Sequence, residues 1–214
     1  MRIAVIGAGN VGGTLGRRWA EVGHDVVFGL REPARGAAGV KGGGALPAGA
    51  MVAGVAEALR GAEVVLLASP WEAVPEALRA AGPLAGVVLI DATNPFGPGF
   101  TMQAGPRGES GGEQVQALVP RARVVKAFNS TGFANMADPL YEGASTVMPY
   151  AGDDASAKAT VRRLVADLGF DPVDAGPLAR SRQLEHLAML WIALAMGIGT
   201  APLGRDIAFR IVRR

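Results

Sequence analysis

The apolar residues of this chain gather in short runs rich in β-branched side chains, and within each run they occupy consecutive positions. Consecutive apolar positions, rather than every second one, are typical of strands that are covered on both faces. Such runs alternate with segments rich in alanine and leucine, so the pattern predicts an α/β protein with a doubly wound parallel sheet. The runs are RIAVIG (2–7), DVVFG (25–29), EVVLLAS (63–69), VVLIDA (87–92), RVVKAF (123–128) and TVMPYAG (146–152).

The segments between these runs have the periodicity of helices. Pro177 suits a helix N-terminus, and Gly197 suits the end of the last helix. That helix is apolar around most of its circumference between Leu184 and Met196, so we expect it to be buried, either under the sheet or against a second subunit. The expected helices are residues 11–22, 55–60, 71–81, 155–168 and 177–196.

Two tracts rich in glycine and proline interrupt the pattern. Residues 39–50 are expected to form an excursion between elements, and residues 95–112 a longer loop near the edge where a ligand binds. Loops of that length in compact domains are usually functional or disordered. A chain of 214 residues is long enough for one well-buried core with a small appended lobe, so we expect one principal domain.

Composition narrows the class of protein. No apolar run reaches the roughly 18–20 residues of a membrane-spanning helix, and the N-terminus runs into a strand without an export signal. The absence of cysteine excludes disulfides and thiolate chemistry and fits a cytoplasmic protein. The net charge is only +2 and the basic residues form scattered pairs, so we expect neither nucleic acid nor membrane as a partner.

Candidate chemistry begins after the first strand, where Gly7, Gly9 and Gly12 have the spacing G-x-G-x-x-G. Between a strand and a helix, the first glycine permits a tight turn, the second lets a pyrophosphate approach the backbone, and the third permits close packing. Amide groups at the helix N-terminus then bind the anion. The pattern predicts dinucleotide binding; the alternative is a glycine turn with a structural role only.

The end of the second strand indicates which dinucleotide is bound. An acidic residue here would bind the ribose hydroxyls of NAD, but the chain has Leu30 followed by Arg31. A guanidinium pairs with a 2′-phosphate through charge-assisted hydrogen bonds, and Arg35, one helical turn later, adds a second cation. We therefore predict NADP. In the alternative, both arginines are solvated and Glu32 binds the ribose of NAD.

Small polar residues and shaped turns follow three later strands. Open parallel sheets bind ligands at the carboxyl ends of their strands, so these segments are candidates to line the nicotinamide. Each is also compatible with ordinary turn chemistry. The segments are Ser69-Pro70-Trp71, Thr93-Asn94-Pro95 and Phe128-Asn129-Ser130.

Groups for acid–base catalysis are scarce, because the chain has two histidines and three lysines. We expect His24 to be structural at the opposite end of the sheet, and His186 to be a hydrogen-bonded histidine of the core. Lys126 is expected to pair with a neighbouring carboxylate, and Asp91 to hold a turn. The pair Asp153-Asp154 is interpreted as the N-cap and first turn of the following helix.

The sequence has no arrangement of nucleophile, histidine and acid, and no cluster of metal ligands. We therefore assign no catalytic residue and no metal. Oxidation of an alcohol needs a base for the hydroxyl proton. Hydride transfer between two aromatic cofactors needs mainly stacking and orientation, which fits this inventory better.

Several longer segments resemble the NADPH-dependent reductases of the deazaflavin coenzyme F420, which also resemble the cytoplasmic flavin-reducing domains of membrane metalloreductases. The likeness runs over nearly the whole chain. Its first segment, GAGNVGGTLGRRWAEVGHDVVFGLR, is common to many dinucleotide-binding proteins, whereas AGDD and DAGPL-x-x-S-R-x-x-E are more specific. The matching segments are residues 7–31, 69–74, 132–136, 151–154 and 174–190.

The resemblance implies a Rossmann domain over residues 1–152 and a small, mainly helical C-terminal α/β lobe over residues 153–214. The lobe would complete the acceptor site and the interface of a homodimer. It also implies that NADPH transfers its hydride to a deazaflavin or to a flavin such as FMN or FAD.

Carried over by position, the resemblance assigns the glycine turn to the pyrophosphate and Arg31 and Arg35 to the 2′-phosphate. It places Ser69 and Pro70, with residues 127–129, beside the nicotinamide. Together with the candidates above, the expected cofactor-binding residues are Gly7, Gly9, Asn10, Val11, Gly12, Leu30, Arg31, Arg35, Ser69, Pro70, Trp71, Asn94, Pro95, Ala127 and Asn129.

Two positions depart from the family pattern. The deazaflavin reductases often have a serine just before the first arginine, where this chain has Leu30. They also have a histidine in the segment matching Phe128-Asn129, whereas this chain reads KAFN, as the flavin-type relatives do.

Three functions follow from these observations. The first is an oxidoreductase that exchanges hydride between NADPH and a deazaflavin or flavin. The second is a reductase of a small imine or carbonyl, and the third is a non-catalytic sensor that binds NADPH and presents its last helix to a partner. Turnover with a supplied acceptor separates them.

Overall fold

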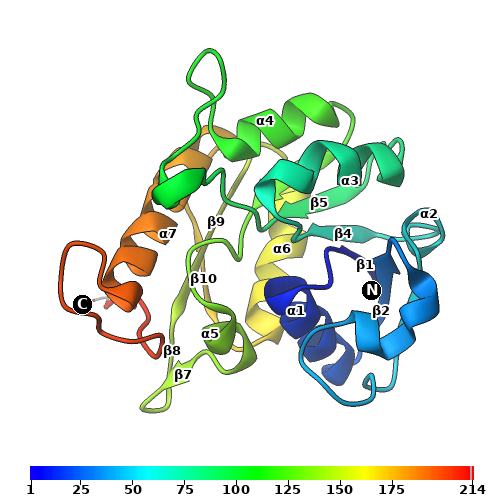
Figure 1. The fold of residues 1–214 in the computed structure, drawn as a ribbon, viewed down its shortest axis with the longest axis horizontal. Coiled ribbons are helices and arrows are strands. Elements are labelled where there is room, and N and C mark those ends of the chain that lie inside the picture. Colours follow the sequence, from blue (N-terminus) through cyan, green and yellow to red (C-terminus); the bar gives the residue numbers. More distant parts are fainter. Residues whose placement is uncertain (213) are drawn as a thin grey trace.

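The computed structural model, which describes residues 1–212 and 214, has a central sheet of eight strands with helices on both faces (Figure 1). The strands are β1 (Arg2–Ile6), β2 (Asp25–Leu30), β3 (Ala50–Gly54), β4 (Val64–Leu67), β5 (Val88–Asp91), β6 (Arg123–Lys126), β9 (Val147–Gly152) and β10 (Asp171–Asp174). Their order is β10-β9-β6-β5-β4-β1-β2-β3. All neighbours are parallel except β6 and β9. A separate hairpin consists of β7 (Leu140–Tyr141) and β8 (Ala144–Ser145).

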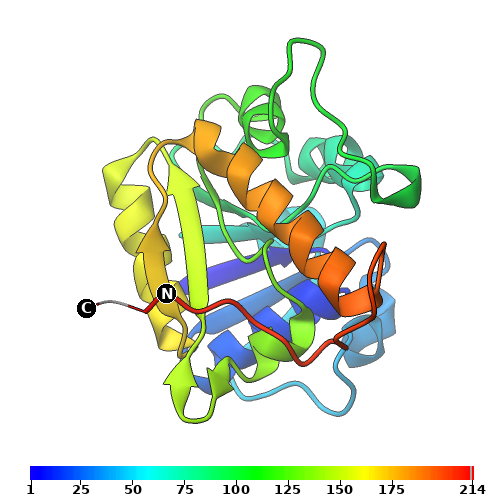
Figure 2. The same cartoon turned by 90° about the vertical axis from the view of Figure 1, so that its left-hand side faces the viewer.

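Helices cover the two faces of the sheet. One face carries α1 (Asn10–Glu21), α5 (Phe133–Ala137) and α6 (Ala155–Asp167), and the other carries α2 (Val55–Ala58), α3 (Val74–Ala81) and α4 (Gly111–Leu118). The last helix, α7 (Ser181–Met196), contacts β9 and α4 and runs obliquely beside β9 in Figure 2. The 3₁₀ turns are η1 (Pro33–Gly39), η2 (Trp71–Ala73), η3 (Pro98–Phe100) and η4 (Leu178–Arg180).

The consecutive apolar residues of each run alternate between two cores. In β1, Ile3 and Val5 pack into the core under α1 and α6, whereas Ala4 and Ile6 pack into the core under α3 and α4. Successive side chains of a strand point to opposite faces, so a sheet with two covered faces needs apolar residues at every position. This arrangement confirms the predicted α/β class. The sheet was predicted to be parallel, and it is parallel except where β9 pairs with β6.

The predicted elements differ from the structure mainly where the chain is polar or rich in glycine. All six predicted strands are present, and the last helix ends at Gly197, whose φ of 76° is left-handed. The helix predicted from Pro177 divides into η4 and α7. The strands and α-helices not predicted are β3, β10, α4, α5 and the hairpin of β7 and β8.

The loop predicted at 95–112 extends two residues too far. Helix α4 begins at Gly111, because Ser110 and Glu113 form a capping box in which each side chain bonds the other residue's backbone amide. The interpretation of Asp153 and Asp154 as the N-cap and first turn of a helix is correct for one of the two residues. Asp154 caps α6 by accepting from the amide of Ala157, but Asp153 accepts from the amide of Leu178 instead.

The two histidines behave differently from each other. His24 is buried and contacts Asp167 at 3.0 Å through Nε2, as expected of a structural residue. The prediction of a core position for His186 is wrong: the residue is exposed and its Nδ1 lies 2.6 Å from the carbonyl oxygen of Arg182. Among the described residues, no helix is long and apolar enough to cross a membrane.

Candidate functional site: a dinucleotide groove and its neighbouring cavities

The glycine turn after β1 is so tightly packed that two of its glycines have no space for a side chain. Gly7 has a φ of 95°, and a Cβ there would lie 2.6 Å from backbone atoms of Ala68 and Ser69. A Cβ on Gly12 would lie 1.9 Å from the carbonyl oxygen of Gly7. The turn therefore holds the start of α1 close to the ends of β1 and β4.

Gly9 differs because a Cβ at this position would meet no atom within 4 Å. It is the N-cap residue of α1, its backbone is extended, and no side chain caps the helix. The amides of a first helical turn have no partner within the helix. Gly9 lines a groove of about 430 Å³, so the turn offers an anion both open space and amide donors.

The groove brings together predicted residues from the ends of three strands. Arg31 and Arg35 come from the segment after β2, and Ser69 from the segment after β4. The predicted cofactor-binding residues among its lining are Gly7, Gly9, Leu30, Arg31, Arg35, Ser69 and Pro70.

The other predicted residues lie around this groove rather than in its lining. The first turn of α1 contains Asn10, Val11 and Gly12, and the ends of β5 and β6 are followed by Asn94, Pro95, Ala127 and Asn129. Trp71 lines a different cavity, between α3 and α4.

Three cations line the part of the groove beyond β2. Arg31 and Arg35 are exposed, and neither has an ion-pair partner in the described chain. Lys41 lies beside them and was not predicted. Its amide donates to the carbonyl oxygen of Ala8 at 2.9 Å, which brings the glycine-rich tract back to the phosphate turn. Unpaired cations beside a helix N-terminus favour a phosphorylated ligand.

Asn94 and Asn129 join the ends of β5 and β6. Asn94 donates through Nδ2 to the carbonyl oxygen of Asn129 at 2.9 Å, and Asn129 donates through Nδ2 to Oδ1 of Asn94 at 3.0 Å. Two buried polar atoms near these strand ends have no partner among the described residues, namely Oγ of Ser69 and Oδ1 of Asn129. Buried polar atoms are normally paired, so both are candidates to bond a ligand.

Phe128 reaches this position with a left-handed backbone. Its φ is 59°, which is uncommon for a bulky residue, and its ring is fully buried against Trp19 and Phe170. Residues held in such conformations occur often at ligand sites, where packing compensates for the strain. Packing of the ring therefore fixes the turn that carries Asn129.

A buried ion cluster lies at the ends of the same two strands. Nζ of Lys126 is 2.9 Å from Oδ2 of Asp91 and 2.9 Å from Oε1 of Glu185, and all three side chains are at most 1% exposed. Glu185, on α7, also accepts from the amides of Gly111 and Gly112 at the start of α4. Asp91 accepts from the amide and hydroxyl of Thr93, as predicted for a turn.

The cluster keeps Lys126 charged. Burial alone would lower the pKa of Lys126, but the carboxylates of Asp91 and Glu185 outweigh burial and raise that pKa above its ordinary value. A lysine held in this way does not release its proton near neutral pH. The residues left beside Ser69 and Asn129 are thus amides and hydroxyls, which position a ligand rather than transfer protons to it.

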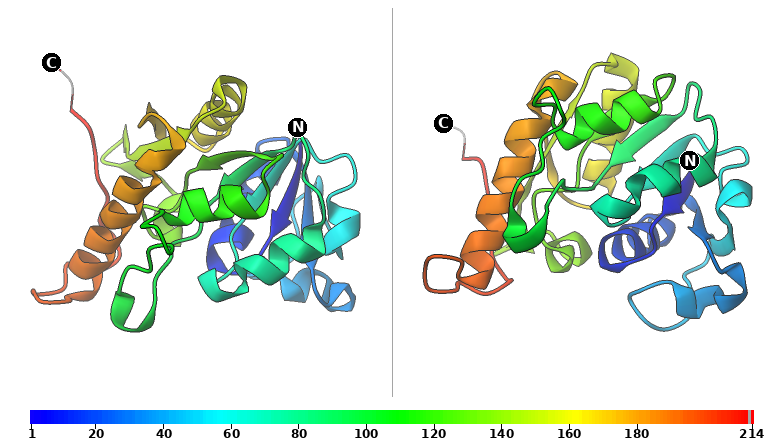
Figure 3. Two further views of the ribbon diagram at one scale, coloured as in Figure 1. Left: turned by 90° about the horizontal axis from the view of Figure 1, so that it is seen from above. Right: turned by 45° about the horizontal axis from the view of Figure 1, so that its top comes forward.

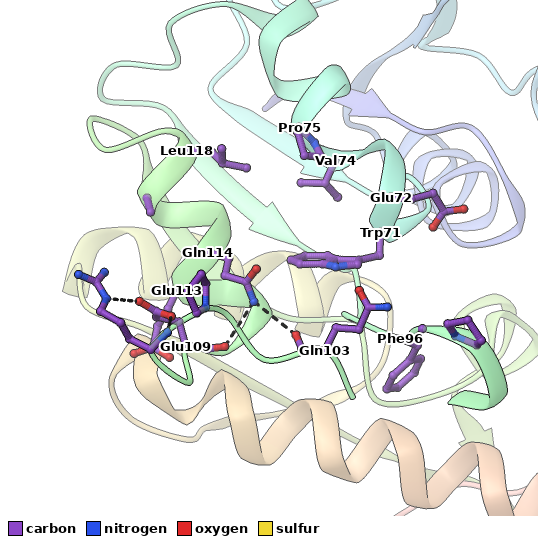
Figure 4. A pocket seen from close by; sticks show the side chains of 15 residues that line it. Trp71, Glu72, Val74, Pro75, Phe96, Gln103, Glu109, Glu113, Gln114 and Leu118 are labelled. Carbon is purple, nitrogen blue, oxygen red and sulfur yellow. Dashed lines mark hydrogen bonds and ion pairs between the residues drawn. The ribbon is translucent and has the colours of Figure 1, made fainter. Parts of the chain in front are cut away.

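A second cavity, of about 1280 Å³, lies between α3 and α4 (Figure 4). Its walls are mainly apolar, and Trp71 and Phe96 both contribute aromatic rings. It begins beside the predicted nicotinamide residues, because Trp71 directly follows Pro70 and Phe96 directly follows Pro95. The fold therefore has two neighbouring cavities: the groove lined by predicted nucleotide-binding residues and this larger, mainly apolar one.

Comparison with known proteins shows the family of the chain. A family model described as NADP oxidoreductase, coenzyme F420-dependent, matches residues 2–95. A candidate F420-dependent NADP reductase of known structure from Arthrobacter sp. FB24 is 34% identical, with a TM-score of 0.84 over the full length of both chains. The metalloreductase STEAP3 of Rattus norvegicus is 32% identical over 88% of this chain. The chain spans about a third of the length of the curated relatives that it matches.

The imine reductase of Streptomyces aurantiacus has a TM-score of 0.65 but only 18% identity, so it is informative about the fold alone. Fold and site together define an NADP-dependent oxidoreductase of the Rossmann type. Within that class, the chain belongs to the family of coenzyme F420-dependent NADP oxidoreductases.

Removal of Arg31 and Arg35 should abolish the expected preference for NADPH over NADH. We expect the double variant Arg31→Ala/Arg35→Ala to raise the Kd for NADPH about tenfold or more and to leave the Kd for NADH unchanged, because NADH has no 2′-phosphate. Titration calorimetry with both nucleotides measures the effect. The matched control is Arg162→Ala/Arg163→Ala on α6, which removes the same charge elsewhere. Equal affinities for NADPH in all three proteins would contradict the assignment.

Proposed function

We propose that the protein transfers hydride between NADPH and a deazaflavin or flavin ring. The observation that carries the proposal is the character of the strand ends beside the groove. Asn94, Asn129 and Ser69 provide neutral polar groups, while Asp91 and Lys126 are buried and paired with each other. Reduction of a carbonyl or imine needs a proton donor at the reacting atom. Transfer between two rings needs mainly alignment.

The residues of this chain would act by binding and orientation. The glycine turn would hold the pyrophosphate, and Arg31, Arg35 and Lys41 would hold the 2′-phosphate. The free Oγ of Ser69 and Oδ1 of Asn129 would bond the carboxamide of the nicotinamide and so fix which face of the ring is presented. When bound, NADPH supplies a hydride and the acceptor ring takes this hydride together with one proton from solvent, which balances the reaction.

The same proposal includes a homodimer formed through α7. The outer side of this helix and the turn after it expose Leu190, Met196 and Ile198, each to about half of its surface. Apolar residues in this proportion along one helix favour contact with a second copy. The division into a Rossmann domain over 1–152 and a lobe over 153–214 stays a prediction.

The proposed reaction predicts that NADPH is oxidised only when a suitable ring is supplied. We expect turnover in a panel of F420, FMN and FAD under exclusion of oxygen, with NADPH preferred over NADH for any acceptor that reacts. Loss of NADPH absorbance measures the rate. Tight NADPH binding without turnover of any acceptor would contradict hydride transfer and favour a nucleotide sensor. Turnover only with small cyclic imines or ketones would favour the imine or carbonyl reductase.

A further inference from the structure

The glycine-rich tract of residues 39–50 folds back along α1 and borders the nucleotide groove. The right-hand view of Figure 3 shows this light-blue segment beside the dark-blue α1. Val40 is buried in the core under α1, and the amide of Lys41 donates to the carbonyl oxygen of Ala8 in the phosphate turn. A Cβ on Gly13 of α1 would lie 2.5 Å from the carbonyl oxygen of Lys41. The tract and the helix are therefore in direct backbone contact.

One side chain of α1 holds the next part of the tract. Arg17 donates to three carbonyl oxygens, from Nη1 to Ala45 at 2.8 Å, from Nε to Lys41 at 3.2 Å and from Nη2 to Gly44 at 3.5 Å. A guanidinium has five donors in fixed directions, so it can bond several carbonyls of one loop at once. Arg17 has no ion-pair partner among the described residues and does not line the nucleotide groove. Its hydrogen bonds are thus made to the tract.

Three successive glycines let the tract turn around this guanidinium. Gly42, Gly43 and Gly44 have φ values of 105°, 70° and 70°, a region that favours glycine. A Cβ on Gly42 would lie 3.0 Å from Nε of Arg17, whereas a Cβ on Gly43 or Gly44 would meet no atom within 4 Å. A side chain at Gly43 would therefore disturb the turn through its backbone conformation and not through a clash.

The backbone of Lys41 is held on both sides, and its side chain lines the groove. Its amide bonds Ala8 at 2.9 Å, and its carbonyl oxygen accepts from Arg17. In the groove it joins Arg31 and Arg35, the two arginines assigned to the 2′-phosphate. Ordering a loop when a ligand binds costs affinity, and a glycine-rich loop has much freedom to lose. A tract that is already held in place avoids this cost.

We propose that Arg17 is a positioning residue for the selection of NADPH over NADH. By holding residues 41–45 against α1, it keeps Lys41 beside the 2′-phosphate, although Arg17 itself does not touch the nucleotide. The inference rests on the proposed binding of that phosphate by Arg31, Arg35 and Lys41, and it concerns nucleotide binding alone, whichever acceptor reacts. NADH has no 2′-phosphate, so loss of Arg17 weakens the binding of NADPH and leaves that of NADH unchanged.

The first test is a double-mutant cycle of Arg17→Ala and Lys41→Ala, with the Kd values of NADPH and NADH measured by titration calorimetry. We expect Lys41→Ala to raise the Kd for NADPH about tenfold and Arg17→Ala about fivefold, with no change for NADH. The double variant should equal Lys41→Ala alone, because Arg17 acts through Lys41. The control is Arg18→Ala, which removes the same charge from the next position of α1, where the side chain pairs with Glu21.

A second variant disturbs the tract without removing a charge. Valine is strongly disfavoured at a left-handed φ, so Gly43→Val should turn the tract away from Arg17 although there is space for the side chain. We expect the Kd for NADPH to rise about fivefold, as in Arg17→Ala, and the Kd for NADH to stay the same. Asparagine tolerates this conformation, so Gly43→Asn is the matched control and should bind NADPH nearly as the unchanged protein does. Unchanged NADH binding also shows that each variant is folded.

Three results would overturn the positioning role. The first is an equal rise in the Kd values of NADPH and NADH in Arg17→Ala, and the second is a double variant in which the two single effects multiply. The third is unchanged NADPH affinity in Gly43→Val. Unchanged NADPH affinity in Lys41→Ala would contradict the assignment of Lys41 to the 2′-phosphate, and the inference with it. Absence of turnover with every acceptor would contradict the proposed hydride transfer, but it would not alter these affinities.

Discussion

Replacing Lys126 with methionine should lower the free energy of unfolding by about 3–5 kcal/mol. The ammonium group of Lys126 lies 2.9 Å from a carboxylate oxygen of Asp91 and 2.9 Å from one of Glu185, and none of the three side chains is more than 1% exposed. Methionine fills a similar volume but leaves two buried carboxylates facing each other without a cation. Chemical denaturation of both proteins at neutral pH measures the difference.

The lower free energy of unfolding of Lys126→Met should come from the unpaired carboxylates rather than from lost packing. The triple variant Lys126→Met/Asp91→Asn/Glu185→Gln removes all three charges, so we expect it to be more stable than Lys126→Met alone. Glu185→Gln by itself should destabilise the fold less than Lys126→Met does. Lys126 keeps its ion pair with Asp91, and the carbonyl oxygen of the new amide side chain still accepts from the amide of Gly112. A loss below about 1 kcal/mol in Lys126→Met would mean that the cluster does not stabilise the fold.

The pH dependence of this stabilisation has a defined sign. Burial alone lowers the pKa of Lys126, but Asp91 and Glu185 raise it above the ordinary value of about 10.4. A raised pKa in the folded state means that the folded protein holds its proton more tightly than the unfolded chain does. The stabilisation that protonated Lys126 gives to the fold is therefore complete below about pH 10. It is lost as the pH rises through the raised pKa of Lys126. The stability difference between the unchanged protein and Lys126→Met should shrink only in that alkaline range.

The fold could be predicted where strands are buried on both faces, because such strands require consecutive apolar residues. The edges of the sheet gave no such signal. In β3, at one edge, Met51 is half exposed and Val52 is the one β-branched residue. In β10, at the other edge, the sequence is DPVD, and a proline is tolerated there because an edge strand leaves some amides unpaired.

Local spacing could predict much of the candidate site, but contacts between distant segments could not be read from it. The glycine turn and Arg31 are local features. Lys41 reaches the groove only because its tract folds back onto Ala8. Glu185 follows Leu184 on the buried side of α7, and its neighbour His186 is turned about 100° further, toward solvent. An acidic residue on a buried helix face indicates that a cation lies beside it, as Lys126 does here.

Replacing Gly9 with aspartate should raise the Kd for NADPH by at least about 100-fold, or about 2.7 kcal/mol, without destabilising the protein. Aspartate is favoured at helix N-caps, the backbone of Gly9 is extended, and a Cβ there meets no atom within 4 Å. The new carboxylate would face the pyrophosphate, and like charges in contact cost several kcal/mol. Calorimetry measures the Kd, and chemical denaturation measures the stability.

Two matched variants separate the causes. Gly9→Asn has nearly the same shape without the charge, so its smaller loss of affinity measures the steric part alone. Gly12→Ala, in contrast, should destabilise the fold, because its Cβ would lie 1.9 Å from the carbonyl oxygen of Gly7. Alanine for glycine within a helix usually stabilises by about 0.5–1 kcal/mol. Here overpacking should outweigh that gain and lower stability by about 1–3 kcal/mol. If Gly9→Asp binds NADPH as tightly as the unchanged protein does, no pyrophosphate approaches the backbone of Gly9. In that case binding and packing are not divided between Gly9 and Gly12.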